Sequence, residues 1–185
     1  MSDLFADLKT CWSGLKLQHC ERVLPRSVWP YLTQHGLMGY AKVKAGREDR
    51  WDFDEAGIGC LTVAVHAEDG ALIDIIAFEP DKPNQWLVRT GNGYFLGENI
   101  LAKAERGIWT DADIPVVVPT PLEWLRIGGR AVCIVDPTPR SLARIRNLGT
   151  LKVPSPRFAQ ALRLQMSRPP RLPEIKILER EKHAA

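Results

Sequence analysis

The sequence predicts a mixed fold of the α+β or α/β class, with N-terminal helices, an antiparallel β-meander, then a βαβ unit and C-terminal helices. Three patterns carry this prediction. Apolar residues recur at helical spacing near both ends, two strand-like segments flank the turn signal Asp69-Gly70, and apolar runs at 115–118 and 131–135 enclose a short helical segment. The chain has 185 residues, of which 45% are hydrophobic and 25% charged, as is typical of one folded domain.

We expect a single α/β domain over residues 1–167, followed by a basic, proline-rich tail over 168–185. Within the domain, the predicted parts are a helical region, a β-meander, a βαβ unit and a pair of basic helices (1–40, 58–97, 115–136 and 138–167).

The N-terminal region predicts two helices and then a loop. The first covers 3–16 and the second starts after Pro25 or Ser27 and ends at Gly36. The charged segment 44–57 predicts a loop, in which Trp51 is the tryptophan expected to be exposed, whereas Trp12 and Trp124 fall on helical apolar faces and are expected in the core. The acidic residues of this loop predict either a solvated turn or a site for a hard cation (Asp52, Asp54 and Glu55).

The meander is predicted from four short segments. Strands at 60–66 and 71–78 form a hairpin around Glu68-Asp69-Gly70, and shorter strands follow at 86–89 and 94–96. Asp74 inside the second strand is interpreted as a polar residue on a sheet face, with a functional role as the alternative. The segment Gly91-Asn92-Gly93 is interpreted as a hairpin turn.

A helix over 98–106, ended by Gly107, leads to the βαβ unit. Thr120, Pro121 and Glu123 have the order of a helix N-terminus with a capping box. Because this helix separates two buried apolar strands, we expect the strands to be parallel. Thr138-Pro139 and Ser155-Pro156 then open two further helices, which end near Leu148 and Ser167.

Charge is distributed unevenly along the chain. The whole sequence carries +3, but residues 137–185 hold 11 basic and 3 acidic residues, a balance of +8, which leaves −5 for residues 1–136. Such asymmetry indicates a polyanionic partner, with a solvated or internally paired surface as the alternative. The predicted nucleic-acid-binding residues are six arginines of this region: Arg140, Arg144, Arg146, Arg157, Arg163 and Arg168.

Several classes of site are not indicated. The four cysteines have no zinc spacing, and Cys60 and Cys133 lie in apolar runs that predict burial. No phosphate-binding loop, dinucleotide-binding motif, zinc protease motif or serine hydrolase motif is present, so no catalytic residue is predicted.

No run is long and apolar enough to cross a membrane, and no secretory signal is recognisable. We therefore expect a cytoplasmic protein without a membrane partner.

The order of segments between Trp29 and Asp136 resembles the toprim-containing primase-like proteins of phages and plasmids. The resemblance rests on Tyr31-Leu32 before Gly36-Leu37, the hairpin 62–78, the segment 89–97 ending in Leu-Gly, and the strand–helix–strand segment 116–135. The resemblance implies a Mg²⁺ site at the strand ends, but this chain departs from the family there. Pro119-Thr120 stands where the family has Glu-Gly, and Asp136-Pro137-Thr138 where it has Asp-x-Asp.

The metal candidates that remain are Asp136 and Glu123, and two-metal chemistry needs more carboxylates than these. The resemblance therefore implies a degenerate copy kept for binding, which needs no cofactor; Mg²⁺ is expected only if the toprim-like site is active.

Three functions follow in order of preference. The first is a non-catalytic accessory protein of the mobile-element type, which binds nucleic acid or a larger nucleic-acid–protein complex through its basic C-terminal third. The second is an inhibitor or assembly factor that binds a partner protein, with the C-terminal tail as a contact. The third is a metal-dependent nuclease or primase-like enzyme that uses Asp136, Glu123 and the Asp52/Asp54 cluster.

Overall fold

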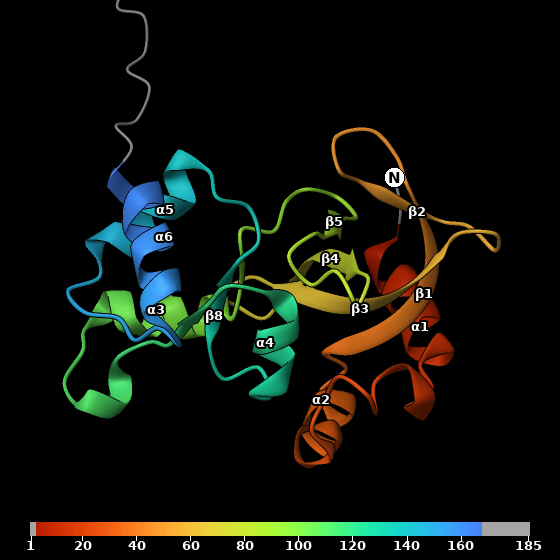
Figure 1. Cartoon of the computed structure of the whole chain (residues 1–185), viewed down its shortest axis with the longest axis horizontal. Helices are drawn as coiled ribbons and strands as arrows, with labels where there is room; N and C mark the ends of the chain where they lie inside the picture. Colours follow the sequence, from red (N-terminus) through yellow and green to blue (C-terminus); the bar gives the residue numbers. More distant parts are fainter. Residues whose placement is uncertain (1–2, 168–185) are drawn as a thin grey trace, which may run out of the picture.

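The computed structural model describes residues 3–167 and confirms the predicted mixed α+β class (Figure 1). The predicted tail over 168–185, with Arg168, lies outside the described residues. Six α-helices occur in the described part of the chain: α1 (Leu4–Gly14), α2 (Trp29–Gln34), α3 (Glu98–Arg106), α4 (Pro121–Arg126), α5 (Pro139–Asn147) and α6 (Pro156–Ser167). Short 3₁₀ helices lie at Leu17–His19, Arg26–Val28 and Asp111–Asp113. Within residues 3–167, no helix is long and apolar enough to cross a membrane.

Two sheets organise these helices. The larger sheet has the order β2-β1-β3-β4-β5 with every pair antiparallel, and its strands are β1 (Met38–Ala45), β2 (Trp51–Phe53), β3 (Ile58–His66), β4 (Leu72–Phe78) and β5 (Leu87–Val88). The smaller sheet has the order β6-β8-β7, with strands β6 (Phe95–Leu96), β7 (Val117–Val118) and β8 (Val132–Ile134). In Figure 1 the larger sheet curls beside α1, and the smaller one lies among α3 to α6.

Helix α1 packs on the larger sheet through one narrow face. Asp3 caps it by accepting hydrogen bonds from the Phe5 and Ala6 backbone N–H groups, and the buried side chains are Leu8 and Cys11. The prediction that Trp12 lies in the core is wrong, because its side chain is 36% exposed. Trp12 lies beside the buried face of α1, which holds Leu8 and Cys11. Its Nε1 donates to the Gly36 carbonyl at 2.9 Å.

The segment predicted as a loop, 44–57, holds the end of β1 and all of β2, which corrects that prediction. Trp51 was expected to be exposed, and it is 1% exposed. Its indole enters the core between α1 and the sheet, and Nε1 donates to the Ile75 carbonyl at 3.0 Å. In this charged segment β2 pairs with β1, and Lys44 lies opposite Asp52. A charged segment can form a strand because the backbone hydrogen bonds to a neighbouring strand do not depend on side-chain polarity.

The predicted hairpin of β3 and β4 is confirmed, with Val63 opposite Ile76 in register. The predicted meander over 58–97 needs one correction, because β6 leaves the larger sheet and pairs with β8. A loop at 89–93 separates β5 from β6 and is held by the buried carboxylate of Asp74.

The Asp74 carboxylate accepts six backbone hydrogen bonds. Oδ1 accepts from the N–H groups of residues 75, 89 and 90 at 2.8 to 2.9 Å, and Oδ2 accepts from residues 91, 92 and 93 at 2.9 to 3.3 Å. Asp74 is therefore a buried anchor for the loop that connects the two sheets, and Gly91-Asn92-Gly93 belongs to this loop and does not form a tight hairpin turn.

The βαβ unit is confirmed as parallel, with Val117 opposite Val132. Thr120 caps α4 by accepting a hydrogen bond from the Glu123 N–H at 3.2 Å. Trp124 is buried as predicted, and its Nε1 donates to the Ala131 carbonyl at 2.8 Å. A core cluster that contains Trp124, Leu61 and Ile76 joins α4 to the larger sheet, so the two sheets share one hydrophobic interior.

All four cysteines are free and buried, including the predicted Cys60 and Cys133. Burial raises the pKa of Cys11, Cys20 and Cys60 to about 11. These thiols are therefore uncharged at neutral pH and pack as small apolar groups.

Candidate nucleic-acid interface

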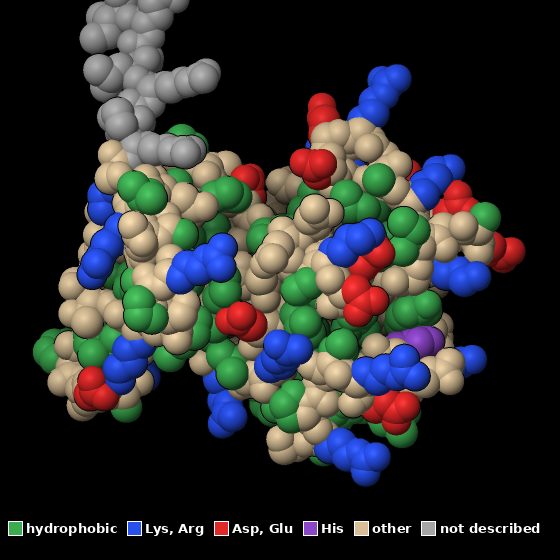
Figure 2. All heavy atoms as spheres, viewed as in Figure 1, with side chains coloured by type: hydrophobic (Ala, Val, Ile, Leu, Met, Phe, Trp, Pro, Cys, Tyr) green, Lys and Arg blue, Asp and Glu red, His purple; other side chains and the backbone are tan. Residues whose placement is uncertain are grey.

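Helices α5 and α6 form the basic end of the molecule. They contact one another and cover a core cluster in which Ile145 and Leu162 pack with Phe95, Val117 and Val132 of the smaller sheet. Residues 137–167 contain six basic residues and no acidic residue. Figure 2 shows Lys and Arg side chains over this part of the molecule, at the left of the view.

The start of α5 follows directly from the end of β8. Thr138 accepts a hydrogen bond from the Ser141 N–H at 3.2 Å, and Ser141 Oγ donates to the Asp136 carbonyl at 2.6 Å. Pro139 stands at the first helical position, as predicted. This turn directs α5 back across the smaller sheet, with Ile145 buried and Arg140 exposed.

Arg144 is held by acidic residues of α3. Its Nε and Nη2 donate to the two carboxylate oxygens of Glu105, each at 2.8 Å, and its Nη1 donates to Glu98 at 2.6 Å. The hydrogen bond to Glu105 raises the pKa of Arg144, and the same bond lowers the pKa of Glu105. Two carboxylates thus balance the charge of a predicted nucleic-acid contact, and its guanidinium is directed toward α3.

Two further cations of this region have partners within the protein. Lys152 forms an ion pair with Asp111 at 2.6 Å. Arg146 donates to the Met166 carbonyl at the end of α6, and this bond leaves its positive charge unbalanced. The internally paired alternative therefore applies to Arg144 and Lys152.

Besides Arg146, three predicted arginines keep their charge available to a partner. Arg140, Arg157 and Arg163 are exposed, and none forms an ion pair with a carboxylate of residues 3–167. Arg140 lies 6.0 Å from the centre of the Tyr94 ring. On α6, Arg157 lies on the face opposite the buried Leu162, and Arg163 lies at the edge of that face.

The two metal candidates do not lie in one metal-binding group. Asp136 follows β8 and lines a hollow of about 350 Å³ with Arg50, Trp86 and Gly93, and burial raises its pKa. Glu123 lies in the first turn of α4 and is not part of that hollow. Residues 3–167 contain no group of three His, Cys, Asp or Glu side chains placed to hold a metal ion.

The acidic cluster predicted around residue 52 is divided between two cations. Asp52 accepts a hydrogen bond from Arg89, and Asp54 lies 3.4 Å from Lys44. The guanidinium of Arg89, a residue that no sequence motif singles out, also pairs with Asp7 and lies over the Trp51 ring, 5.1 Å from its centre. No local pattern marks this residue, because its partners lie 37 and 82 residues away.

No family model, curated protein or solved structure matches the chain. The resemblance to toprim-containing primase-like proteins therefore rests on the short sequence motifs between Trp29 and Asp136 alone.

Proposed function

We propose that this protein is a non-catalytic accessory protein, of the mobile-element type that the toprim-like motifs imply, and that it binds nucleic acid through α5 and α6. The observation that carries the proposal is the set of four exposed arginines on α5 and α6 without a carboxylate partner in the described chain, Arg140, Arg146, Arg157 and Arg163. They belong to a stretch of 31 residues, 137–167, without any acidic side chain.

Exposed guanidinium groups bind phosphate oxygens, and phosphate contacts carry no direct sequence information. Binding is therefore independent of sequence to a first approximation and weakens as salt rises, with a slope of about −0.9 per phosphate neutralised on duplex DNA. Tyr94 beside Arg140 adds an aromatic ring near the same surface, and such rings stack on unpaired bases. We expect single strands to bind at least as well as duplexes of equal charge.

The test is a salt titration of labelled duplex DNA, single-stranded DNA and RNA with the full chain. The triple variant Arg140→Glu, Arg157→Glu and Arg163→Glu should lose measurable binding at physiological salt and lower the salt slope by about three. A matched triple, Lys9→Glu, Arg22→Glu and Arg26→Glu, makes the same change of net charge at exposed positions of the N-terminal region. It should reduce affinity only slightly.

The variant Arg144→Gln distinguishes nucleic-acid binding by the exposed arginines from the internal ion pairs of Arg144 with Glu98 and Glu105. We expect it to lower stability while the salt slope stays the same, because Glu98 and Glu105 already bind the guanidinium. Unchanged binding by the α5–α6 triple would overturn the proposal. Equal losses in both triples would also overturn it, because net charge alone would then explain the binding.

A second candidate function is the binding of a partner protein, favoured by two exposed apolar side chains. Trp109 is 86% exposed and Leu164 on α6 is 62% exposed, and tryptophan is among the side chains enriched at binding hot spots. A protein that co-purifies in stoichiometric amount, without nucleic acid, and is lost from a Trp109→Ser, Leu164→Ser variant would establish this function.

A further inference from the structure

The larger sheet is curled so that its two edges approach each other. The loop 46–50 between β1 and β2 reaches β5, where the Val88 N–H donates to the Asp49 carbonyl at 2.9 Å and Arg50 forms a β-bridge with Val88. Glu48 and Asp49 adopt left-handed backbone conformations, with φ of 57° and 56°. This geometry turns the loop over one face of the sheet.

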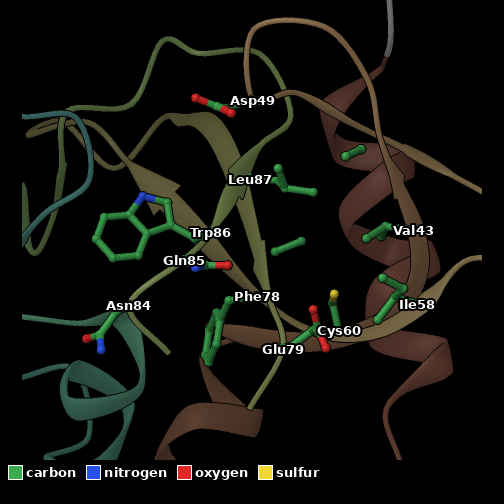
Figure 3. Close-up of a pocket in the computed structure, with 12 residues that line it drawn as sticks. Val43, Asp49, Ile58, Cys60, Phe78, Glu79, Asn84, Gln85, Trp86 and Leu87 are labelled. Atoms are coloured by element: carbon green, nitrogen blue, oxygen red, sulfur yellow. The ribbon is translucent and has the colours of Figure 1, made fainter. Parts of the chain in front are cut away.

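Helix α1 covers only part of that face. Leu8 and Cys11 pack with Ala64 and Ile75, while the neighbouring part of the same face opens into a pocket of about 460 Å³. The lining residues of β1 and β3 alternate along their strands, as the period of a β-strand requires: Val43, Ala45, Ile58 and Cys60. Ala77, Phe78, Trp86 and Leu87 complete the apolar lining. Figure 3 shows Val43, Ile58, Cys60 and Leu87 turned toward this common space.

The pocket has the properties of a small-ligand site. Its volume falls within the usual range for such sites, and an apolar interior with few polar groups at the rim is their typical composition. Ile58 is 57% exposed at the mouth, although it is a large apolar side chain. Cys60 is an uncharged thiol that extends the apolar wall.

The rim is acidic. Its polar side chains are Asp49, Glu79, Asn84 and Gln85, and no Lys or Arg lines the pocket. Figure 3 shows Asp49 on the loop above the apolar side chains and Glu79 below them. The Glu79 carboxylate already binds an ammonium group of the protein, because Lys82 Nζ lies 3.0 and 3.2 Å from its two oxygens.

We propose that this pocket binds primary amines with an aliphatic tail, with the tail among the apolar side chains and the ammonium at the Glu79 carboxylate. Lys82 occupies the position that such a ligand would take at Glu79, so the two ammonium groups compete. This activity is independent of the basic surface on α5 and α6.

The experiment measures binding of hexylamine, hexanol and hexanoate to the ¹⁵N-labelled full chain by NMR. Hexylamine should shift the signals of pocket residues, including the Asn84 and Gln85 side-chain amides, and saturate, whereas hexanoate should bind more weakly than hexanol. Equal or tighter binding of hexanoate, or shifts confined to other regions, would overturn the proposal.

Variants at the Glu79–Lys82 pair give the sharper test. Glu79→Gln should weaken hexylamine binding about two- to fivefold, as expected for an exposed ion pair, and Lys82→Ala should strengthen it by a similar factor. Hexanol binding should change in neither variant. Glu21→Gln, an equal charge change at an exposed position outside the pocket, is the control.

Ala45→Trp places a large side chain at the exposed mouth of the pocket and should abolish binding of both hexylamine and hexanol. An unchanged pattern of amide signals elsewhere shows that this variant is folded. Changes in the same direction for Glu79→Gln and Lys82→Ala, or undiminished binding by folded Ala45→Trp, would refute the pocket as the amine site.

Discussion

Arg89 Nε donates a hydrogen bond to Asp7 Oδ2 at 2.9 Å, which ties the segment after β5 to α1 across 82 residues of sequence. The same guanidinium donates to the Trp51 carbonyl at 2.8 Å and to Asp52. Both side chains of the Arg89–Asp7 pair are largely buried. One residue therefore links α1, β2 and the loop that leads to the smaller sheet.

Arg89→Met should lower the free energy of unfolding by about 2–4 kcal/mol, because it leaves the Asp7 carboxylate and the Trp51 carbonyl without their donor in a largely buried site. Urea unfolding followed by circular dichroism measures this loss. Arg50→Met removes an exposed guanidinium that lies 3.6 Å from Glu48 and should change stability by less than about 0.5 kcal/mol. Equal losses in the two variants would contradict the linking role of Arg89.

Asp74→Ala should be among the most damaging single substitutions in this chain. It removes the acceptor of six backbone N–H groups, and unsatisfied buried donors cost about 1–3 kcal/mol each. We expect a loss above about 3 kcal/mol, measured by urea unfolding, with rapid amide exchange at residues 89–93. Asp81→Ala, at an exposed position, should stay within about 0.5 kcal/mol. A mild effect of Asp74→Ala would show that the loop keeps its structure without the carboxylate.

The Arg144–Glu105 pair should contribute a pH-dependent part of the stability. Its hydrogen bond lowers the pKa of Glu105 from the ordinary value of 4.5, so the contribution is complete above that value and is lost as the pH falls through the folded-state pKa. In Arg144→Gln, the pKa of Glu105 should return toward 4.5, and the decline of stability between about pH 5 and about pH 3 should become shallower. Carboxyl NMR titration and urea midpoints across this range measure both effects. An unchanged titration of Glu105 would rule out the pairing in solution.

Gly97 and Gly149 should respond oppositely to alanine. Gly97 has a φ of 74°, and a Cβ atom there would lie 2.1 Å from the Ala131 carbonyl oxygen, so Gly97→Ala should cost at least about 2 kcal/mol. No heavy atom lies within 4 Å of a Cβ at Gly149, so Gly149→Ala should be neutral or stabilise the fold by up to about 1 kcal/mol. Thermal unfolding of the two variants tests this, and a tolerated Gly97→Ala would show that the junction between β6 and α3 adapts to a side chain.

Local sequence determined much of the secondary structure. Helix α3 has the predicted bounds because Gly97 and Gly107 flank it with positive φ values that favour glycine. The hairpin of β3 and β4 and the parallel βαβ unit also follow from apolar patterning and turn residues. Trp124 was correctly placed in the core because both its helix and its apolar neighbours are local features of the sequence.

Contacts between distant segments decided the rest. Strand β2 has three residues within a charged stretch, so no periodicity marks it, and it exists because β1 provides its hydrogen-bond partners. The sequence places Arg140 and Arg144 on one face of α5, four residues apart, and only the position of α3 shows that Arg144 alone meets Glu98 and Glu105. The amine pocket likewise requires four strands to meet with α1 covering only part of their face. Helix and turn preferences act over a few residues, whereas burial and charge pairing depend on which segments the folded chain brings together.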